Sequence, residues 1–146
     1  MSAEDGSLTL EFGGEEQTFR LAYGQFRELQ ETINKPRIES NCPVIGPGEL
    51  GEALRRGSAW PHDAREVIRL GLIGGGMKPD RALVLVKRHV ENKPFYPSML
   101  LAQAILYYAL VGPPDDPVGK DPAPAEPETP ATNGSGFPPS TASALQ

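Results

Sequence analysis

The chain has 146 residues, about the size of one domain, of which 23% are charged and 38% hydrophobic. Its formal net charge of −5 is uneven, because residues 113–146 carry five acids and one base whereas residues 1–112 carry 14 acids and 13 bases. A nearly neutral main part argues against binding to a nucleic-acid backbone as the principal function, since that binding needs clustered, uncompensated Lys and Arg.

Composition divides the chain into a short flexible lead (1–6), a single globular domain (7–112) and a C-terminal tail (113–146). The tail holds nine of the sixteen prolines and one aromatic residue. Such a segment cannot bury enough apolar surface to offset the entropy of ordering it, so we predict an acidic, disordered tail that acts as a spacer or solubiliser.

The domain opens with two alternating runs on either side of Gly13-Gly14. Leu8, Leu10 and Phe12 alternate with polar residues, and the second run spans residues 18–21. Alternation around a glycine pair predicts a β-hairpin. A lone hairpin is marginal in water, so we expect it to pack on an apolar surface.

After the hairpin, apolar residues recur at helical spacing. A first stripe predicts a helix that ends near Lys35-Pro36, because the residue before proline disfavours the helical conformation. Its apolar positions are Ala22, Phe26, Leu29 and Ile33. After an irregular segment (38–48), a short helix carries Leu50, Ala53 and Leu54 and stops at Gly57, a residue type suited to the position just past a helix.

Two more helices are punctuated by proline and glycine. Pro61 suits the first turn of one helix, although Asp63 and Glu66 offer an alternative capping box. The apolar face of this helix consists of Ala64, Val67, Ile68, Gly71 and Leu72, and it ends at Gly74-Gly75-Gly76. The next helix starts at Pro79 and stops before Pro94, with a stripe of Ala82, Leu83, Val86 and Val90.

The last predicted helix, Ser98–Val111, is apolar nearly all round, with Ser98 as its expected N-cap. Its apolar run is too short to cross a bilayer, which takes about 20 residues. We therefore expect a helix that is buried centrally or covered on one side by a partner. The predicted fold is α+β and mainly α: an N-terminal β-hairpin, about five short helices and a disordered Pro-rich C-terminal tail.

Residues that could support catalysis are few. The triple glycine follows a helical stripe, and Lys78 is succeeded by proline, so the pattern of a phosphate-binding loop is not met. His62 and His89 have no nucleophile in a suitable context, and Cys42 is the only cysteine, which excludes an intrachain disulfide. We predict no catalytic, metal or cofactor site and no enzymatic activity. The N-terminus shows no secretory leader, so a reducing cytoplasm is expected.

Basic residues leave one alternative open. Two helices joined through a glycine turn could form a helix-turn-helix that binds DNA. The bases in this region are Arg55, Arg56, Arg65, Arg69, Arg81, Lys87 and Arg88. Acidic residues interleave with them, which is typical of a solvated helix face, so no nucleic-acid partner is expected.

The segment 65–112 contains the string Gly71-Leu72-Ile73-Gly74-Gly75-Gly76, followed by Pro79. With this string as its most specific element, the segment resembles the gene transfer agent family of small tail proteins. Further matching positions are Ala82, Leu85, Val86, Val90, Lys93, Pro94, the 101–106 run and the 109–112 ending. The opening hairpin and the helix at 23–33 also fit, whereas the loop 37–48 departs from the family pattern.

The resemblance implies a non-enzymatic protein of a phage-type tail, whose partners are other tail proteins. By analogy with tail assembly chaperones, it would bind the tape-measure protein in the bacterial cytoplasm during particle assembly. The alternatives are a structural tail component kept in the particle and a small DNA-binding regulator. A homo-oligomer is left open, and no membrane association is expected.

A partner-binding surface is predicted on the last helix, where a client helix would dock into an apolar groove. The residues predicted for it are Met99, Leu100, Ile105, Tyr107, Tyr108 and Leu110. The competing interpretation is that the same residues form only the core.

Overall fold

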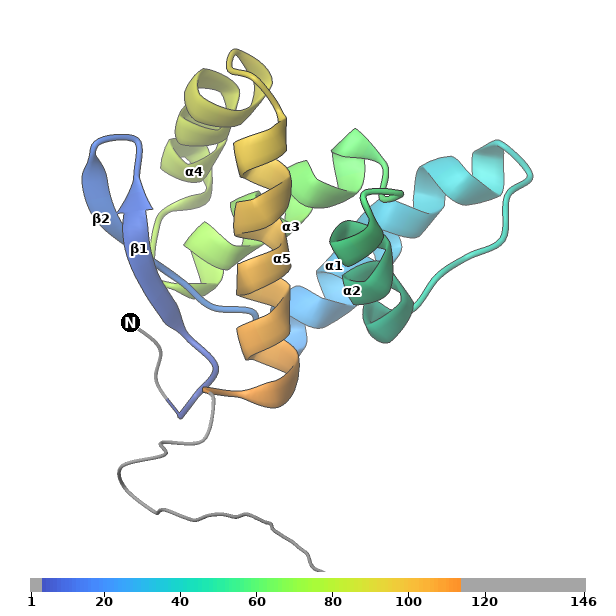
Figure 1. Cartoon of the computed structure of the whole chain (residues 1–146), viewed down its shortest axis with the longest axis horizontal. Helices are drawn as coiled ribbons and strands as arrows, with labels where there is room; N and C mark the ends of the chain where they lie inside the picture. Colours follow the sequence, from blue (N-terminus) through green and yellow to red (C-terminus); the bar gives the residue numbers. More distant parts are fainter. Residues whose placement is uncertain (1–3, 114–146) are drawn as a thin grey trace, which may run out of the picture. The chain divides into compact units, whose positions relative to one another are not determined.

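The computed structural model describes residues 4–113, which form the predicted α+β, mainly helical fold. A hairpin comes first and five α-helices follow (Figure 1). The predicted tail lies outside the described residues apart from Pro113, and so do the first three residues of the predicted lead. The limits of the domain, residues 7–112, stay a prediction.

The hairpin pairs strand β1 (Leu8–Phe12) with strand β2 (Glu15–Phe19) in antiparallel register. Gly13 and Gly14 join them with φ angles of 68° and 87°. Two consecutive positive φ angles are those of the tight turn that suits a twisted hairpin, and glycine adopts them without strain. The buried side chains on its inner face are Leu8, Phe12 and Phe19. The predicted hairpin is confirmed, although its second strand covers residues 15–19 and not 18–21.

Helix α1 (Tyr23–Glu39) continues past Pro36, so the prediction that it ends near Lys35-Pro36 is wrong. Pro36 has no N–H to bond within the helix, which normally ends or kinks it. The following turn is held instead by Arg37, which donates from Nη1 to the carbonyl oxygen of Ile33 at 2.8 Å. Arg37 also forms a buried ion pair with a later helix. These contacts outweigh the local preference.

Helices α2 (Pro47–Arg56) and α3 (Pro61–Gly74) both begin with a proline in the first turn, where the missing N–H would have no partner. Helix α2 stops at Gly57, whose φ of 78° is left-handed, as predicted. The irregular segment between α1 and α2 spans residues 40–46. It is shorter than the predicted 38–48, because both flanking helices extend into it.

Helix α4 (Pro79–Val86) continues directly into a π-helical turn, η1 (Lys87–Glu91). The predicted stripe of this helix is wrong at Leu83, which is 36% exposed, whereas Leu85 is buried. The other three predicted positions are buried in the core.

Helix α5 (Tyr96–Val111) begins two residues before the predicted N-cap. Pro97 fits within the first turn for the reason given for α2 and α3. Ser98 is therefore not the N-cap; it lies inside the helix, and its side chain is buried.

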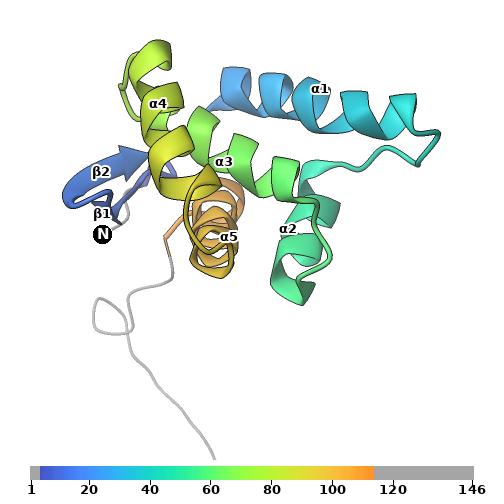
Figure 2. The same ribbon diagram turned by 90° about the horizontal axis from the view of Figure 1, so that it is seen from above.

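The buried hydrophobic side chains form one cluster centred on α3. Helix α3 packs against α1, α4, α5 and β2, and α5 also packs against α2. Figure 2 shows α3 between α1 and α5. This packing covers one side of α5 only. None of the described helices is long and apolar enough to span a membrane.

Candidate functional site

Helix α5 has 16 residues and no charged side chain. Its inner side packs in the core through Ala102, Ile105 and Leu106, each at most 1% exposed. The opposite side bears five apolar or aromatic side chains that are 44–69% exposed. These are Tyr96, Leu100, Tyr107, Leu110 and Val111, which we call the α5 face. Their spacing places them along one side of a helix.

The six residues predicted to bind a partner are divided between two environments. Leu100, Tyr107 and Leu110 lie on the α5 face. Met99 and Tyr108 are half-buried against the core. Ile105 is 1% exposed and belongs to the core, so it cannot contact a partner while the domain is folded. The core interpretation therefore holds for Ile105, whereas partner binding by the exposed residues stays a prediction.

The sequence prediction missed Tyr96 and Val111, which are the most exposed members of the face at 69% and 59%. Tyr96 was left out because the helix was expected to start at Ser98. The sequence does contain a pattern that predicts Tyr96 on this face. Proline is favoured in the first turn of a helix, and in a helix that starts before Pro97 the residues 96, 100, 107 and 111 lie on one side.

The α5 face is bordered on two sides by neighbouring segments of the chain. A Cβ atom on Gly51 of α2 would lie 3.8 Å from Leu106 and 3.9 Å from Leu110. A Cβ on Gly6 would lie 3.2 Å from the carbonyl oxygen of Tyr108. Helix α2 therefore flanks the face on one side and the segment before β1 flanks it on the other (Figure 1).

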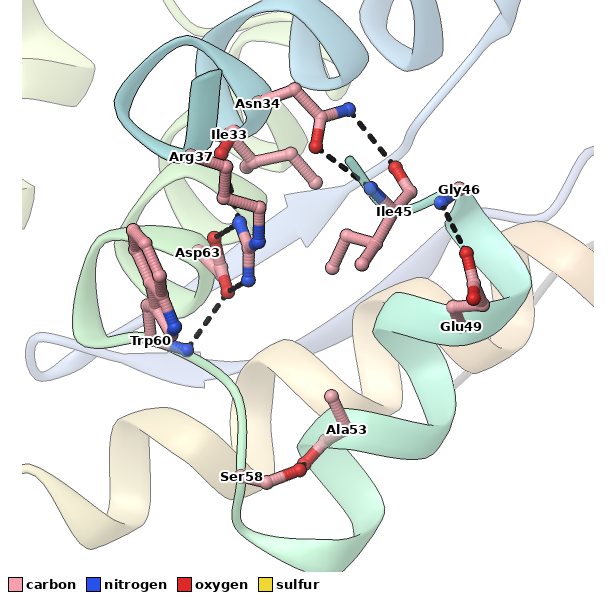
Figure 3. Close-up of polar contacts among 10 residues, drawn as sticks. All are labelled: Ile33, Asn34, Arg37, Ile45, Gly46, Glu49, Ala53, Ser58, Trp60 and Asp63. Atoms are coloured by element: carbon pink, nitrogen blue, oxygen red, sulfur yellow. Dashed lines mark hydrogen bonds and ion pairs between the residues drawn. The ribbon is translucent and has the colours of Figure 1, made fainter. Parts of the chain in front are cut away.

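A buried ion pair joins α1 to α3 (Figure 3). Arg37 donates through Nη1 and Nη2 to the two carboxylate oxygens of Asp63, at 2.7 and 2.6 Å. The side chains are 6% and 0% exposed, and hydrogen bonding to Asp63 raises the pKa of Arg37 above its ordinary value. The guanidinium carbon lies 4.4 Å from the centroid of the Trp60 ring.

The same carboxylate holds the start of α3. Its Oδ2 accepts the backbone N–H of Trp60 at 2.8 Å, so Asp63 sits in the first turn while Trp60 is the N-cap. The alternative in which Asp63 is the cap and Glu66 completes a capping box is therefore wrong. Because these hydrogen bonds join Arg37 of α1 to Asp63 of α3, the pair holds the two helices together.

The segment between α1 and α2 is fastened to α1 (Figure 3). The Asn34 side-chain amide donates to the Ile45 carbonyl oxygen and accepts the Ile45 N–H, both at 2.9 Å. Cys42 lies in this segment, and its thiol is 3.7 Å from the carbonyl oxygen of Ser40.

The glycine cluster at the end of α3 allows two backbones to touch. A Cβ on Gly74 would lie 1.9 Å from the carbonyl oxygen of Arg20, and one on Gly75 would lie 1.9 Å from that of Thr18. No side chain fits at either position. The cluster also lies at the carboxyl end of the helix, whereas phosphate binds at amino ends. The predicted helix stop is thus also a close helix-to-strand contact.

Several arginines that suggested a DNA-binding surface are engaged by carboxylates. Arg55 pairs with Glu52 at 2.7 Å on α2. Glu66 is 2% exposed and accepts hydrogen bonds from both Arg65 and Arg69. Within residues 4–113, no group of three His, Cys, Asp or Glu side chains is placed to hold a metal ion.

Residues 5–112 match the family described as phage tail tube protein, GTA-gp10. No curated protein and no solved structure matches the chain. The matched range contains both strands, the five helices and the whole α5 face.

Proposed function

Since the chain belongs to the GTA-gp10 family of phage tail tube proteins, we propose that it is a non-enzymatic chaperone of tail assembly. In this proposal it binds the tape-measure protein in the bacterial cytoplasm and keeps it soluble until tube subunits surround it. The α5 face is the surface that receives the client.

The observation that carries the proposal is the exposure of the α5 face. Apolar side chains in water are unfavourable, and a contiguous exposed patch on a small soluble protein marks a contact with another molecule. The face runs from Tyr96 to Val111, about 22 Å at 1.5 Å per residue, or four helical turns. A tape-measure protein is expected to be long and helical with apolar stripes, and in this proposal one such stripe packs on the α5 face in a helix-on-helix contact.

A co-purification experiment tests this function. The tape-measure protein is co-expressed with the wild-type chain, with Leu100→Glu, or with Val84→Glu. Leu100 and Val84 are 50% and 51% exposed, so neither change disturbs the core, but only Leu100 lies on the α5 face. We expect Leu100→Glu to lose the client and Val84→Glu to retain it. Equal capture by both variants would contradict the proposal.

A second candidate is a structural component that stays in the finished tail, and the description of the family as a tail tube protein favours it. Quantitative mass spectrometry of purified particles separates the two. A chaperone should be absent or far below the copy number of the tube subunits, whereas a structural component should occur in fixed stoichiometry.

A further inference from the structure

The apolar positions of α5 have nearly the same spacing when read in either direction, and we propose that a second copy of this chain covers the α5 face. The two α5 helices would pack antiparallel around a two-fold axis between Gln103 and Ala104. This dimer does not depend on the proposed function, although it uses the same face and a client would displace it.

The register follows from the positions of the exposed residues. The axis lies between residues 103 and 104, so a residue of one copy faces the residue of the other copy for which the two residue numbers add up to 207. Tyr96 then faces Val111 of the other copy, and Leu100 faces its Tyr107. All four residues are at least half exposed in the single chain. A two-fold interface places one patch against itself, so this internal symmetry is what such a contact needs.

The absence of charge on α5 favours a second copy as the occupant. In a two-fold contact the same patch lies on both sides of the interface, so a patch of one charge sign would repel itself. Helix α5 has no charged residue. By contrast, the exposed Val84 of α4 is followed by the exposed bases Lys87 and Arg88, which would oppose pairing of that surface.

Gln103 lies beside the proposed axis and is partly exposed. Its side-chain amide makes no hydrogen bond within residues 4–113. An amide has both donors and an acceptor, so two copies of Gln103 could bond to each other across the axis. A single polar residue in an apolar helix contact fixes its register.

The size of the face indicates a weak dimer. At their observed exposures, the five side chains offer roughly 500 Å² per copy, or about 1,000 Å² for the pair, the lower limit of specific interfaces. We therefore expect dissociation at micromolar concentrations.

Sedimentation of the full chain, without any client, tests both the face and the register. The wild-type chain and Val84→Glu should dimerise as concentration rises into the micromolar range. Leu100→Glu and Tyr107→Lys, each alone, should remain monomeric. Mixed one to one, these two variants should form a heterodimer, with a dissociation constant at least tenfold below that of either alone, because positions 100 and 107 face each other. Circular dichroism checks that each variant is folded.

A wild-type chain that stays monomeric at 1 mM, or a Leu100→Glu variant that dimerises like wild type, would overturn the proposed interface. A mixture that stays monomeric would overturn the antiparallel register. None of these results concerns the tape-measure protein, so failure here leaves the co-purification test of the function intact.

Discussion

The buried pair of Arg37 and Asp63 gives the sharpest test of how this domain is held together. Replacing Asp63 by Leu removes two short hydrogen bonds to the guanidinium and the acceptor for the Trp60 N–H. It also leaves Arg37 charged in an almost fully buried position. Removing one partner of a buried ion pair lowers the free energy of unfolding by about 3–5 kcal/mol, which is a large part of the stability of a small domain.

Trp60 makes this change measurable, because it is the only tryptophan and it contacts the guanidinium directly. Urea unfolding followed by tryptophan fluorescence should show a midpoint lowered by roughly 2 M, for a dependence of about 2 kcal/mol per molar urea. Glu52→Ala is the control, since its pair with Arg55 is more than half exposed and such surface pairs add little to stability.

The double variant Arg37→Met with Asp63→Leu completes the test. Because an apolar pair can replace a buried ion pair, the double change should cost about 2 kcal/mol less than the sum of the two single changes. Additive losses, or a single Asp63→Leu that costs less than about 1 kcal/mol, would refute the role given to this pair.

Three further predictions concern the rest of the fold. Gly75→Ala places a Cβ 1.9 Å from a strand carbonyl oxygen and should lower thermal stability by more than about 2 kcal/mol, whereas Gly48→Ala, which meets nothing within 4 Å, should not. Ile105→Ala should cost about 2–5 kcal/mol in urea unfolding because it opens a cavity in the core, and Leu100→Ala should cost far less; similar losses would mean that α5 is buried on both sides. Removal of residues 114–146 should leave the melting temperature within a few degrees, and a large drop would contradict the predicted domain boundary.

The parts of the fold that the sequence predicted are those governed by local chemistry. The Gly13-Gly14 turn needs positive φ angles that glycine adopts easily, so the hairpin could be located from four or five neighbouring residues. Pro61 and Gly57 likewise begin and end their helices through backbone preferences alone.

The error at the end of helix α1 arises because a residue far away in the sequence determines the local structure. Helix α1 continues past Pro36 because Arg37 finds Asp63, which lies 26 positions further along the chain. No local pattern contains that partner. The same holds for Gly74 and Gly75, because glycine is required there by the carbonyl oxygens of Arg20 and of Thr18 in β2, which lie far away in the sequence.

The candidate site could be assigned to a helix but not to one side of it. Helix α5 is apolar nearly all round, so its hydrophobic pattern has no period that separates an inner from an outer side. The packing of α3 and α2 fixes this orientation in the structure. That is why Ile105, placed on the surface by the sequence prediction, belongs to the core.

A helix without ionisable groups also determines how its contacts respond to solution conditions. Ionic contacts between exposed groups weaken as added salt screens them, with a Debye length near 8 Å at physiological ionic strength. Contacts through α5 have no such charges to screen. They should resist sodium chloride, tighten in ammonium sulfate and loosen on cooling, as apolar association does.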